Sequence, residues 1–231
     1  AEQEYKQLTQ SEEDVSQLEE EILQLEKEVL QAGREISAER RQLAAELEHD
    51  IHQELSDLYM EKAVFKVDFS EKIESLSIED ANPHGLDRVS FLIATNPGEP
   101  LKALENVASG GELSRMMLAL KTIFSKKQTL ATNILDEVDT GVSGRVAAAI
   151  AEKIAAISEH NQVLCITHLP QVAAAADHHL YISKEVKDGR TSTRVKYLGE
   201  DEKVKEIAEM LAGSELSEHT LITAQELRKS R

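Results

Sequence analysis

The residues that could carry out chemistry fall in three short stretches of the chain. The first is "ASGGE", residues 108–112, where Ser109, Gly110 and Gly111 come directly before an apolar run with helical spacing. A helix that starts with glycines offers bare backbone N–H groups at its positive end, which suits an anion and phosphate above all. The alternative is an ordinary helix that tolerates two glycines, with Ser109 as N-cap and Glu112 as the other half of a capping box.

The second stretch is "NILDE", residues 133–137, in which Asp136 and Glu137 follow a short apolar run. Adjacent residues at the end of a strand point to different sides. One carboxylate can therefore serve a Mg²⁺ shell while the next orients a water molecule. The alternative for this stretch is an acidic turn at a strand end that binds nothing.

The third stretch is "LCITH", residues 164–168, which puts His168 at the end of the next apolar run. If the two runs are parallel strands, His168 and the acidic pair share one edge of a sheet. A lone histidine at a strand end is more often structural. Cys165, His168, His178 and His179 could suggest a metal, but Cys165 lies inside the apolar run and fits a small buried side chain better.

Composition limits the classes of protein to which the chain can belong. Of its 231 residues, 41% are hydrophobic and only 3% aromatic, while 30% are charged, which favours a globular part combined with long helices. There is no run of 18 apolar residues that could span a membrane, and the polar, acidic start of the chain is not typical of a signal peptide. The single cysteine excludes an internal disulfide and fits a reducing cytosol.

The net charge of −17 is unevenly distributed. Residues 1–60 hold 17 acidic against 5 basic residues, so −12 of the charge lies there. This acidity argues against nucleic-acid binding along the first segment. A modest basic stretch at 184–196 is more typical of solvated surface than of a DNA contact.

The first segment carries a heptad repeat, which predicts a coiled-coil helix over residues 1–60. One long helix cannot bury such a seam, so it needs a partner helix. That partner belongs either to a second copy or to an intramolecular hairpin whose other half lies outside this chain. Gly33 is expected to interrupt the helix mildly, at about 1 kcal/mol. The seam consists of Leu8, Val15, Ile22, Val29, Ile36 and Leu43, with Leu18, Leu25 and Ala32 three residues after its members.

From about residue 63 the pattern changes to alternating strands and helices, which predicts an α/β fold with a mixed, mainly parallel sheet and flanking helices. The apolar runs in "NILDE" and "VLCIT" are expected to be buried on both faces of the sheet. Met116 and Met117 are expected in the core. Strands are predicted at 63–69, 87–95, 130–135, 162–167, 179–184 and 192–198, and helices at 111–126, 144–158, 170–176, 201–212 and 217–229.

In this order, the three stretches resemble the signature motif, the Walker B strand and the switch histidine of ATP-binding-cassette (ABC) ATPases. The coiled coil narrows the resemblance to the SMC-like group. The sequences "DEVDTGVSGRVA" and "CITHLPQVAAAAD" are similar to those of the members of the SMC-like group that act in bacterial DNA double-strand-break repair. The resemblance covers essentially the whole chain, which corresponds to the second half of such a protein. Residues 1–60 match the coiled-coil helix that returns to the head, and residues 61–231 match the C-terminal part of an ABC-type head.

The resemblance implies a cytoplasmic, nucleoid-associated ATPase that uses ATP and Mg²⁺. Its implied partners are the N-terminal half of the same protein, a second copy of the head that dimerises with ATP, and DNA. Asp136 would help to hold Mg²⁺ through water, and Glu137 would orient or activate the attacking water. His168 would contact the γ-phosphate, and Ser109, Gly110 and Gly111 would cap the γ-phosphate of a nucleotide on another head.

The sequence departs from the family pattern at three points. There is no G-x-x-x-x-G-K-[ST] stretch, so the phosphate-binding loop is expected in the N-terminal half and this chain alone is expected to be inactive. Ser143 stands where an aspartate is usual, and Asn133 where an apolar residue is usual. The rival hypothesis is a coiled-coil scaffold that does not hydrolyse ATP, but such a scaffold would not need Asp136 and Glu137. The coiled-coil arm argues against a transporter subunit.

Overall fold

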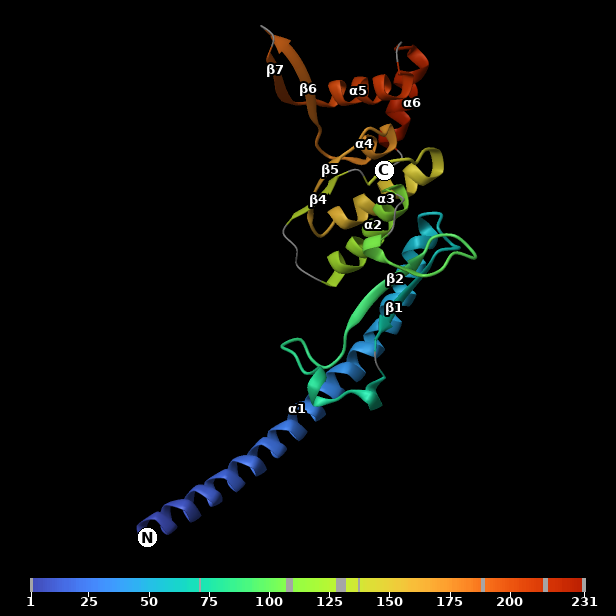
Figure 1. Cartoon of the computed structure of the whole chain (residues 1–231). Helices are drawn as coiled ribbons and strands as arrows, with labels where there is room; N and C mark the ends of the chain where they lie inside the picture. Colours follow the sequence, from blue (N-terminus) through green and yellow to red (C-terminus); the bar gives the residue numbers. More distant parts are fainter. Residues whose placement is uncertain are drawn as a thin grey trace. The chain divides into compact units, whose positions relative to one another are not determined.

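The computed structural model describes residues 2–70, 72–106, 110–127, 132–136, 138–187, 190–213 and 216–229 (Figure 1). Contacts divide the chain into two compact units. The first unit comprises Ala1–His49, Phe65–Ala94 and Leu101–Ala103, and the second comprises Asp50–Val64, Thr95–Pro100 and Leu104–Arg231. The division of the chain into an arm at 1–60 and a head at 61–231 stays a prediction.

Helix α1, Glu2–Asp57, confirms the long helix that the heptad pattern predicts (Figure 1). From Val15 onward its seam residues are exposed, including Ile22, Val29 and Leu43. Exposed apolar residues at heptad spacing are expected of a helix whose partner is a separate segment or molecule.

A different side of α1 is buried within the first unit. There the helix packs with a sheet in which strand β2 (Val89–Ala94) lies between β1 (Val64–Phe69) and β3 (Lys102–Ala103). A Cβ added to Gly33 would overlap the side chain of Leu86. Gly33 is therefore a point of close approach, and the sequence-based view of it as a mild interruption missed this role. Short 3₁₀ turns lie at Ile73–Ser75, Ile78–Asp80 and Leu104–Asn106.

The second unit contains the remaining helices and strands, close to the positions that the sequence predicts. The order is α2 (Gly110–Lys127), β4 (Thr132–Asp136), α3 (Gly144–Ser158), β5 (Gln162–Ile166), α4 (Pro170–Ala175), β6 (Leu180–Lys187), β7 (Arg190–Tyr197), α5 (Glu200–Ala212) and α6 (Glu218–Lys229). Strands β4 and β5 pair in parallel, with Asp136 opposite Ile166, and α3 connects them. Helix α3 contacts α2, α4 and β5.

Two predictions about burial in the second unit are wrong. On one side of the β4–β5 pair the side chains of Asn133 and Leu135 are buried. The other side is open to solvent, and Ile134 on that side is 63% exposed. Nothing among the described residues covers that side. Met117 is 40% exposed because it lies on the side of α2 opposite to the buried face, which consists of residues 116, 118, 119, 120, 122, 123 and 125.

The C-terminal part of the second unit joins a helical cluster to a β-hairpin. Helices α4, α5 and α6 pack together through four alanines and one larger side chain: Ala173, Ala174, Ile207, Ala208 and Ala224. Strands β6 and β7 form an antiparallel hairpin that is exposed over nearly all its length. Among the described residues, no helix combines the length and apolar character that crossing a membrane requires.

Candidate functional site

The two glycines at the start of α2 have different surroundings. Helix α2 begins at Gly110, one residue before the predicted start at 111. Ser109 lies outside the described residues, so its capping role stays a prediction. A Cβ on Gly111 would come within 2.8 Å of the carbonyl oxygen of Thr140, but one on Gly110 would meet no described atom within 4 Å. Gly111 is thus required by packing, and Gly110 leaves backbone open to a ligand.

The acidic pair follows β4. Asp136 ends the strand with its side chain exposed, whereas Glu137 falls in a gap of the described chain. Mg²⁺ in a phosphate site typically takes one or two carboxylates and keeps several waters. The single exposed carboxylate of Asp136 at the strand end therefore fits a site in which the protein supplies only one or two of the Mg²⁺ ligands.

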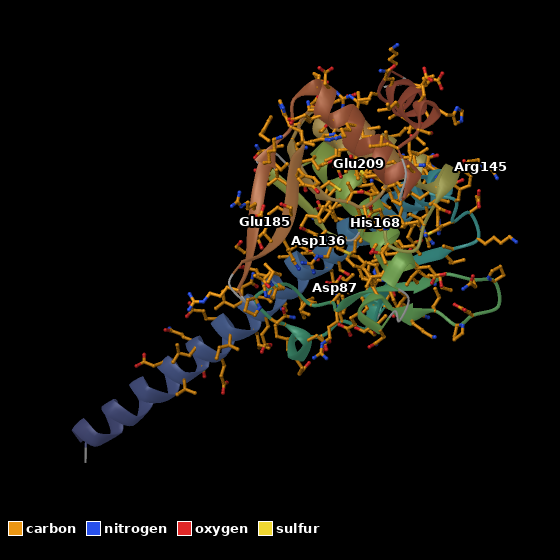
Figure 2. All side chains as sticks on the ribbon, turned by 90° about the horizontal axis from the view of Figure 1, so that it is seen from above. Asp87, Asp136, Arg145, His168, Glu185 and Glu209 are labelled. Carbon is orange, nitrogen blue, oxygen red and sulfur yellow. The ribbon has the colours of Figure 1, made fainter. Side chains whose placement is uncertain are left out.

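The parallel register brings Asp136 and His168 to the same edge of the sheet. Asp136 lies opposite Ile166, and the turn that carries His168 begins directly after that residue. Both side chains are labelled in Figure 2. The expectation that the two strand ends meet at one edge is therefore confirmed.

Sequence analysis missed Asp139, which lies in the loop between β4 and α3. Its carboxylate is 1% exposed, and its Oδ2 accepts a hydrogen bond from the Thr167 hydroxyl and one from the backbone N–H of His168 at 3.3 Å. The signal was present in "DEVD" as a third acid after the strand, but its partners are 28 and 29 residues further along the chain.

The same loop also contacts the start of α2, because Thr140 follows Asp139 and its carbonyl approaches Gly111. One four-residue loop, 138–141, therefore touches both the glycine helix start and the turn with His168. This convergence of three separate stretches is the central feature of the candidate site.

The backbone of His168 is held by Asp139, whereas its ring is largely exposed. Its Nδ1 lies 3.7 Å from Oδ1 of Asp139, while 68% of the side chain is exposed. Beside it, the backbone N–H of Leu169 donates to the Thr167 hydroxyl oxygen at 3.0 Å. The more distant ring nitrogen, Nε2, is therefore available to a ligand.

Cys165 lies on β5, below this turn. Burial, together with the negative charges of Asp139 and Asp136, raises the pKa of its thiol to about 12. The thiol is therefore protonated at neutral pH, which argues against a role as a nucleophile. Within the described parts of the chain, no group of three or more His, Cys, Asp or Glu side chains could hold a metal ion.

Ser143 and Asn133, the two residues that depart from the family pattern, both lie within the described part of the chain. Ser143 is the N-cap residue of α3, and its side chain makes no capping hydrogen bond. Asn133 faces the buried side of β4, and its Nδ2 has no hydrogen-bond partner among the described residues. Nothing in the structure explains the choice of asparagine there.

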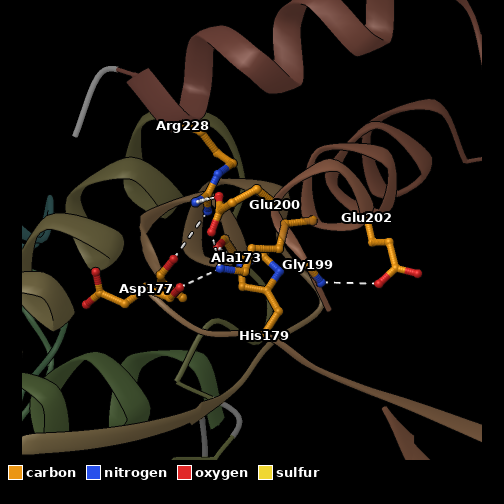
Figure 3. Close-up of polar contacts among 9 residues, drawn as sticks. Ala173, Asp177, His179, Gly199, Glu200, Glu202 and Arg228 are labelled. Carbon is orange, nitrogen blue, oxygen red and sulfur yellow. Dashed lines mark hydrogen bonds and ion pairs between the residues drawn. The ribbon is translucent and has the colours of Figure 1, made fainter. Parts of the chain in front are cut away.

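A second polar cluster lies at the other end of α4 (Figure 3). His179 is buried, and its Nε2 is 2.7 Å from the carbonyl oxygen of Ala173. The Nζ of Lys203 donates to the Asp177 carbonyl at 2.7 Å and to Oε1 of Glu200 at 2.6 Å. Arg228 donates to the Ala176 carbonyl and to the same Glu200 carboxylate.

The polar groups of this cluster bind one another and nearby backbone carbonyls. Burial lowers the pKa of His179, and the positive charges of Arg228 and Lys203 add to that effect, against the hydrogen bond to Ala173, which raises it. The donors bind carbonyl groups at and after the end of α4, where the helix runs out of N–H partners; the Ala173 carbonyl also accepts from the backbone N–H of Ala176 at 3.1 Å. We interpret the cluster as a structural support for the turn between α4 and β6.

Sequence comparison finds close relatives for this chain, although no protein-family model matches it. It is 57% identical over 194 residues to the "DNA repair protein RecN" of Bacillus subtilis, which covers 79% of this chain and 33% of that protein. It is 42% identical over 181 residues to the protein of the same name from Vibrio cholerae, covering 78% of this chain and 32% of that protein. The chain thus spans about a third of the length of these curated relatives.

Comparison with solved structures identifies the fold. The Smc head domain with a coiled coil and joint from Pyrococcus yayanosii aligns with a TM-score of 0.62 and 20% identity, over 90% of this chain and 37% of that one. The Smc head domain with an extended coiled coil from Pyrococcus furiosus aligns with a TM-score of 0.56 and 19% identity, over 91% and 48%. The fold is therefore that of part of an SMC-type ATPase head with its coiled-coil helix, and by its sequence the chain belongs to the RecN family.

Proposed function

We propose that this chain is the C-terminal part of an SMC-like ATPase that acts in DNA double-strand-break repair and recombination. Residues 1–60 would form one strand of an intramolecular coiled-coil arm, and residues 61–231 the C-terminal part of the head. The observation that carries the proposal is the convergence on loop 138–141, which links the glycine helix start to the turn with His168 beside the end of β4. The names of the relatives support the role in DNA repair.

In the complete head, each candidate residue would act on a different part of the nucleotide. Asp136 would hold Mg²⁺ through water, and Glu137 would orient the attacking water. When bound, Mg²⁺ neutralises charge on the β- and γ-phosphates. His168 would contact the γ-phosphate through Nε2, because its Nδ1 side faces Asp139.

The signature residues Ser109, Gly110 and Gly111 would act on a nucleotide held by a second head. The near side of that nucleotide would be filled by the phosphate loop of its own N-terminal half, so a helix start can reach the γ-phosphate only from outside. ATP would then join two heads, and hydrolysis would release them. The open side of β4 and β5 offers an apolar surface to the N-terminal half. We place the protein in the cytoplasm, on the nucleoid, with DNA as its further partner.

The first test is Glu137→Gln in the full-length protein. The amide keeps the shape of the side chain but loses the carboxylate that orients water, so ATP should still bind while turnover falls by roughly 10²–10⁴. The measurements are steady-state ATPase and nucleotide binding, with Glu159→Gln on the exposed end of α3 as the control. Near-normal turnover with intact binding would assign the role to another residue. If the unaltered full-length protein itself shows no turnover, the non-hydrolysing scaffold is favoured instead.

Mixing two inactive variants tests whether the signature acts across heads. Ser109→Arg should block the approach of the helix start, and Glu137→Gln should stop hydrolysis in its own head. A mixed dimer would contain one site built entirely from unaltered groups, so activity should return. If mixed dimers form but no activity returns, the glycines serve their own head.

A further inference from the structure

We propose that Asp139 is a positioning residue for His168: its buried carboxylate fixes the turn at 167–169 so that the imidazole is presented to the γ-phosphate. The inference rests on the proposed function of His168 and deepens it.

Burial of Asp139 is the first argument. A carboxylate that is 1% exposed is costly unless hydrogen bonds or a counter-charge compensate it. The hydrogen bonds that compensate Asp139 come from Thr167 and from the backbone of His168. If the loop and the turn moved apart, the carboxylate would lose both donors, so the two segments are held together.

The way in which the turn is held is the second argument. Asp139 binds the Thr167 hydroxyl, and the oxygen of that hydroxyl accepts from the backbone N–H of Leu169. Oδ2 of Asp139 also accepts from the N–H of His168, and Oδ1 faces the ring at 3.7 Å. Three consecutive residues are therefore held through one carboxylate.

Exposure of the ring is the third argument. The support is buried, but 68% of the histidine side chain that it carries is exposed. An exposed side chain on a fixed backbone is what a well-oriented ligand contact requires, because misplacement by about 1 Å can cost roughly 10²-fold in rate. Asp139 also couples this geometry to the adjacent Thr140, which contacts the start of α2.

A double-mutant cycle in the full-length protein separates positioning from general stability. His168→Gln should lower kcat by roughly 10²–10³, as the loss of a group that stabilises transition-state charge does. Asp139→Asn should lower kcat by roughly 10–100-fold, with the KM for ATP little changed. In the His168→Gln background, Asp139→Asn should cause no further loss. Glu159→Gln is again the control.

The outcomes distinguish this inference from the proposed function. If His168→Gln leaves turnover unchanged, the proposed role of the histidine is wrong, whatever Asp139 does. If His168→Gln is impaired but Asp139→Asn is not, or if the two losses multiply, Asp139 does not act through His168 and the inference alone is overturned.

A second pair of variants keeps the test valid if Asp139→Asn unfolds the protein. Thr167→Val removes the hydroxyl at nearly constant size, and Thr167→Ser restores it. Turnover should fall in the first and recover in the second. Equal turnover in both variants would contradict the inference.

Amide hydrogen exchange in this chain gives a readout that does not depend on ATP. Thr167→Val should accelerate exchange of the His168 N–H, while exchange at buried Ile150 of α3 should not change. Unchanged exchange at His168 would show that the hydroxyl does not help to fix the turn, and would overturn the inference.

Discussion

The two ends of helix α4 each carry a histidine, and the two histidines are built in opposite ways. His168 comes two residues before the helix, with an exposed ring and a buried acidic support. His179 comes four residues after it, with a buried ring whose Nε2 lies 2.7 Å from a backbone carbonyl and with Lys203 and Arg228 nearby.

This difference shows where chemistry is possible. The His179 ring is enclosed, and one of its nitrogens is already used by the protein, so it has little capacity for a ligand. His168 has a backbone held by Asp139, and its Nε2 has no partner among the described residues. The two histidines cannot be told apart by residue type or by their position after a strand or a helix. They differ in what surrounds each ring.

The largest expected effect comes from changing each histidine to leucine. His168→Leu should lower ATP turnover of the full-length protein by roughly 10²–10³ and leave the thermal stability of this chain nearly unchanged. His179→Leu removes the hydrogen bond between the ring and the Ala173 carbonyl, which keeps the backbone N–H of Ala176 as a partner, so it should cost about 0.5–1.5 kcal/mol in the free energy of unfolding. Thermal and urea denaturation, together with ATPase assays, would measure both. If the two variants change ATP turnover and stability in the same way, the proposed difference between the two histidines is wrong.

The next effect concerns the cations around His179. Lys203 is 3% exposed and binds both Asp177 and Glu200, so Lys203→Met should destabilise the chain by about 1–3 kcal/mol, since it removes two hydrogen bonds of a charged group. Lys205→Met, two residues further along α5, is the matched control. Lys205 is exposed and lies 3.8 Å from Glu209, so its loss should stay within about 0.5 kcal/mol. Equal losses in urea denaturation would mean that the cluster contributes little.

The smallest effect is a pH dependence. The pKa of His179 is lowered in the folded chain, first by burial, so the unfolded chain binds a proton more readily there. Stability from the neutral ring is fully present above the unfolded pKa of about 6.5 and is lost as the pH falls through the folded pKa. The groups that face the ring are Arg228, Lys203 and Glu200.

Urea denaturation at a series of pH values between about 8 and 5 would test this. The unaltered chain and His168→Leu should both lose stability as the pH falls, and His179→Leu should lose less. If His168→Leu removes the pH dependence instead, the assignment of the two histidines is reversed.

The sequence by itself determined the local structure and the order of the motifs. The heptads of α1, the period of α2 and the apolar runs of β4 and β5 are properties of neighbouring residues, and propensity and burial patterns act over that range. Asp136, His168, Gly110 and Gly111 could also be chosen from their types and from the strand or helix that each one follows.

Only the tertiary structure decided which residues meet. Asp139 gains its role from residues 28 and 29 positions away, Gly111 from the carbonyl of Thr140, and Gly33 from Leu86, and none of these pairs leaves a periodic signal. Tertiary structure also left one side of β4 and β5 open and turned Met117 outward. The physical reason is that local patterns specify which face of an element is apolar, whereas close approach and hydrogen bonding depend on which other element packs against that face.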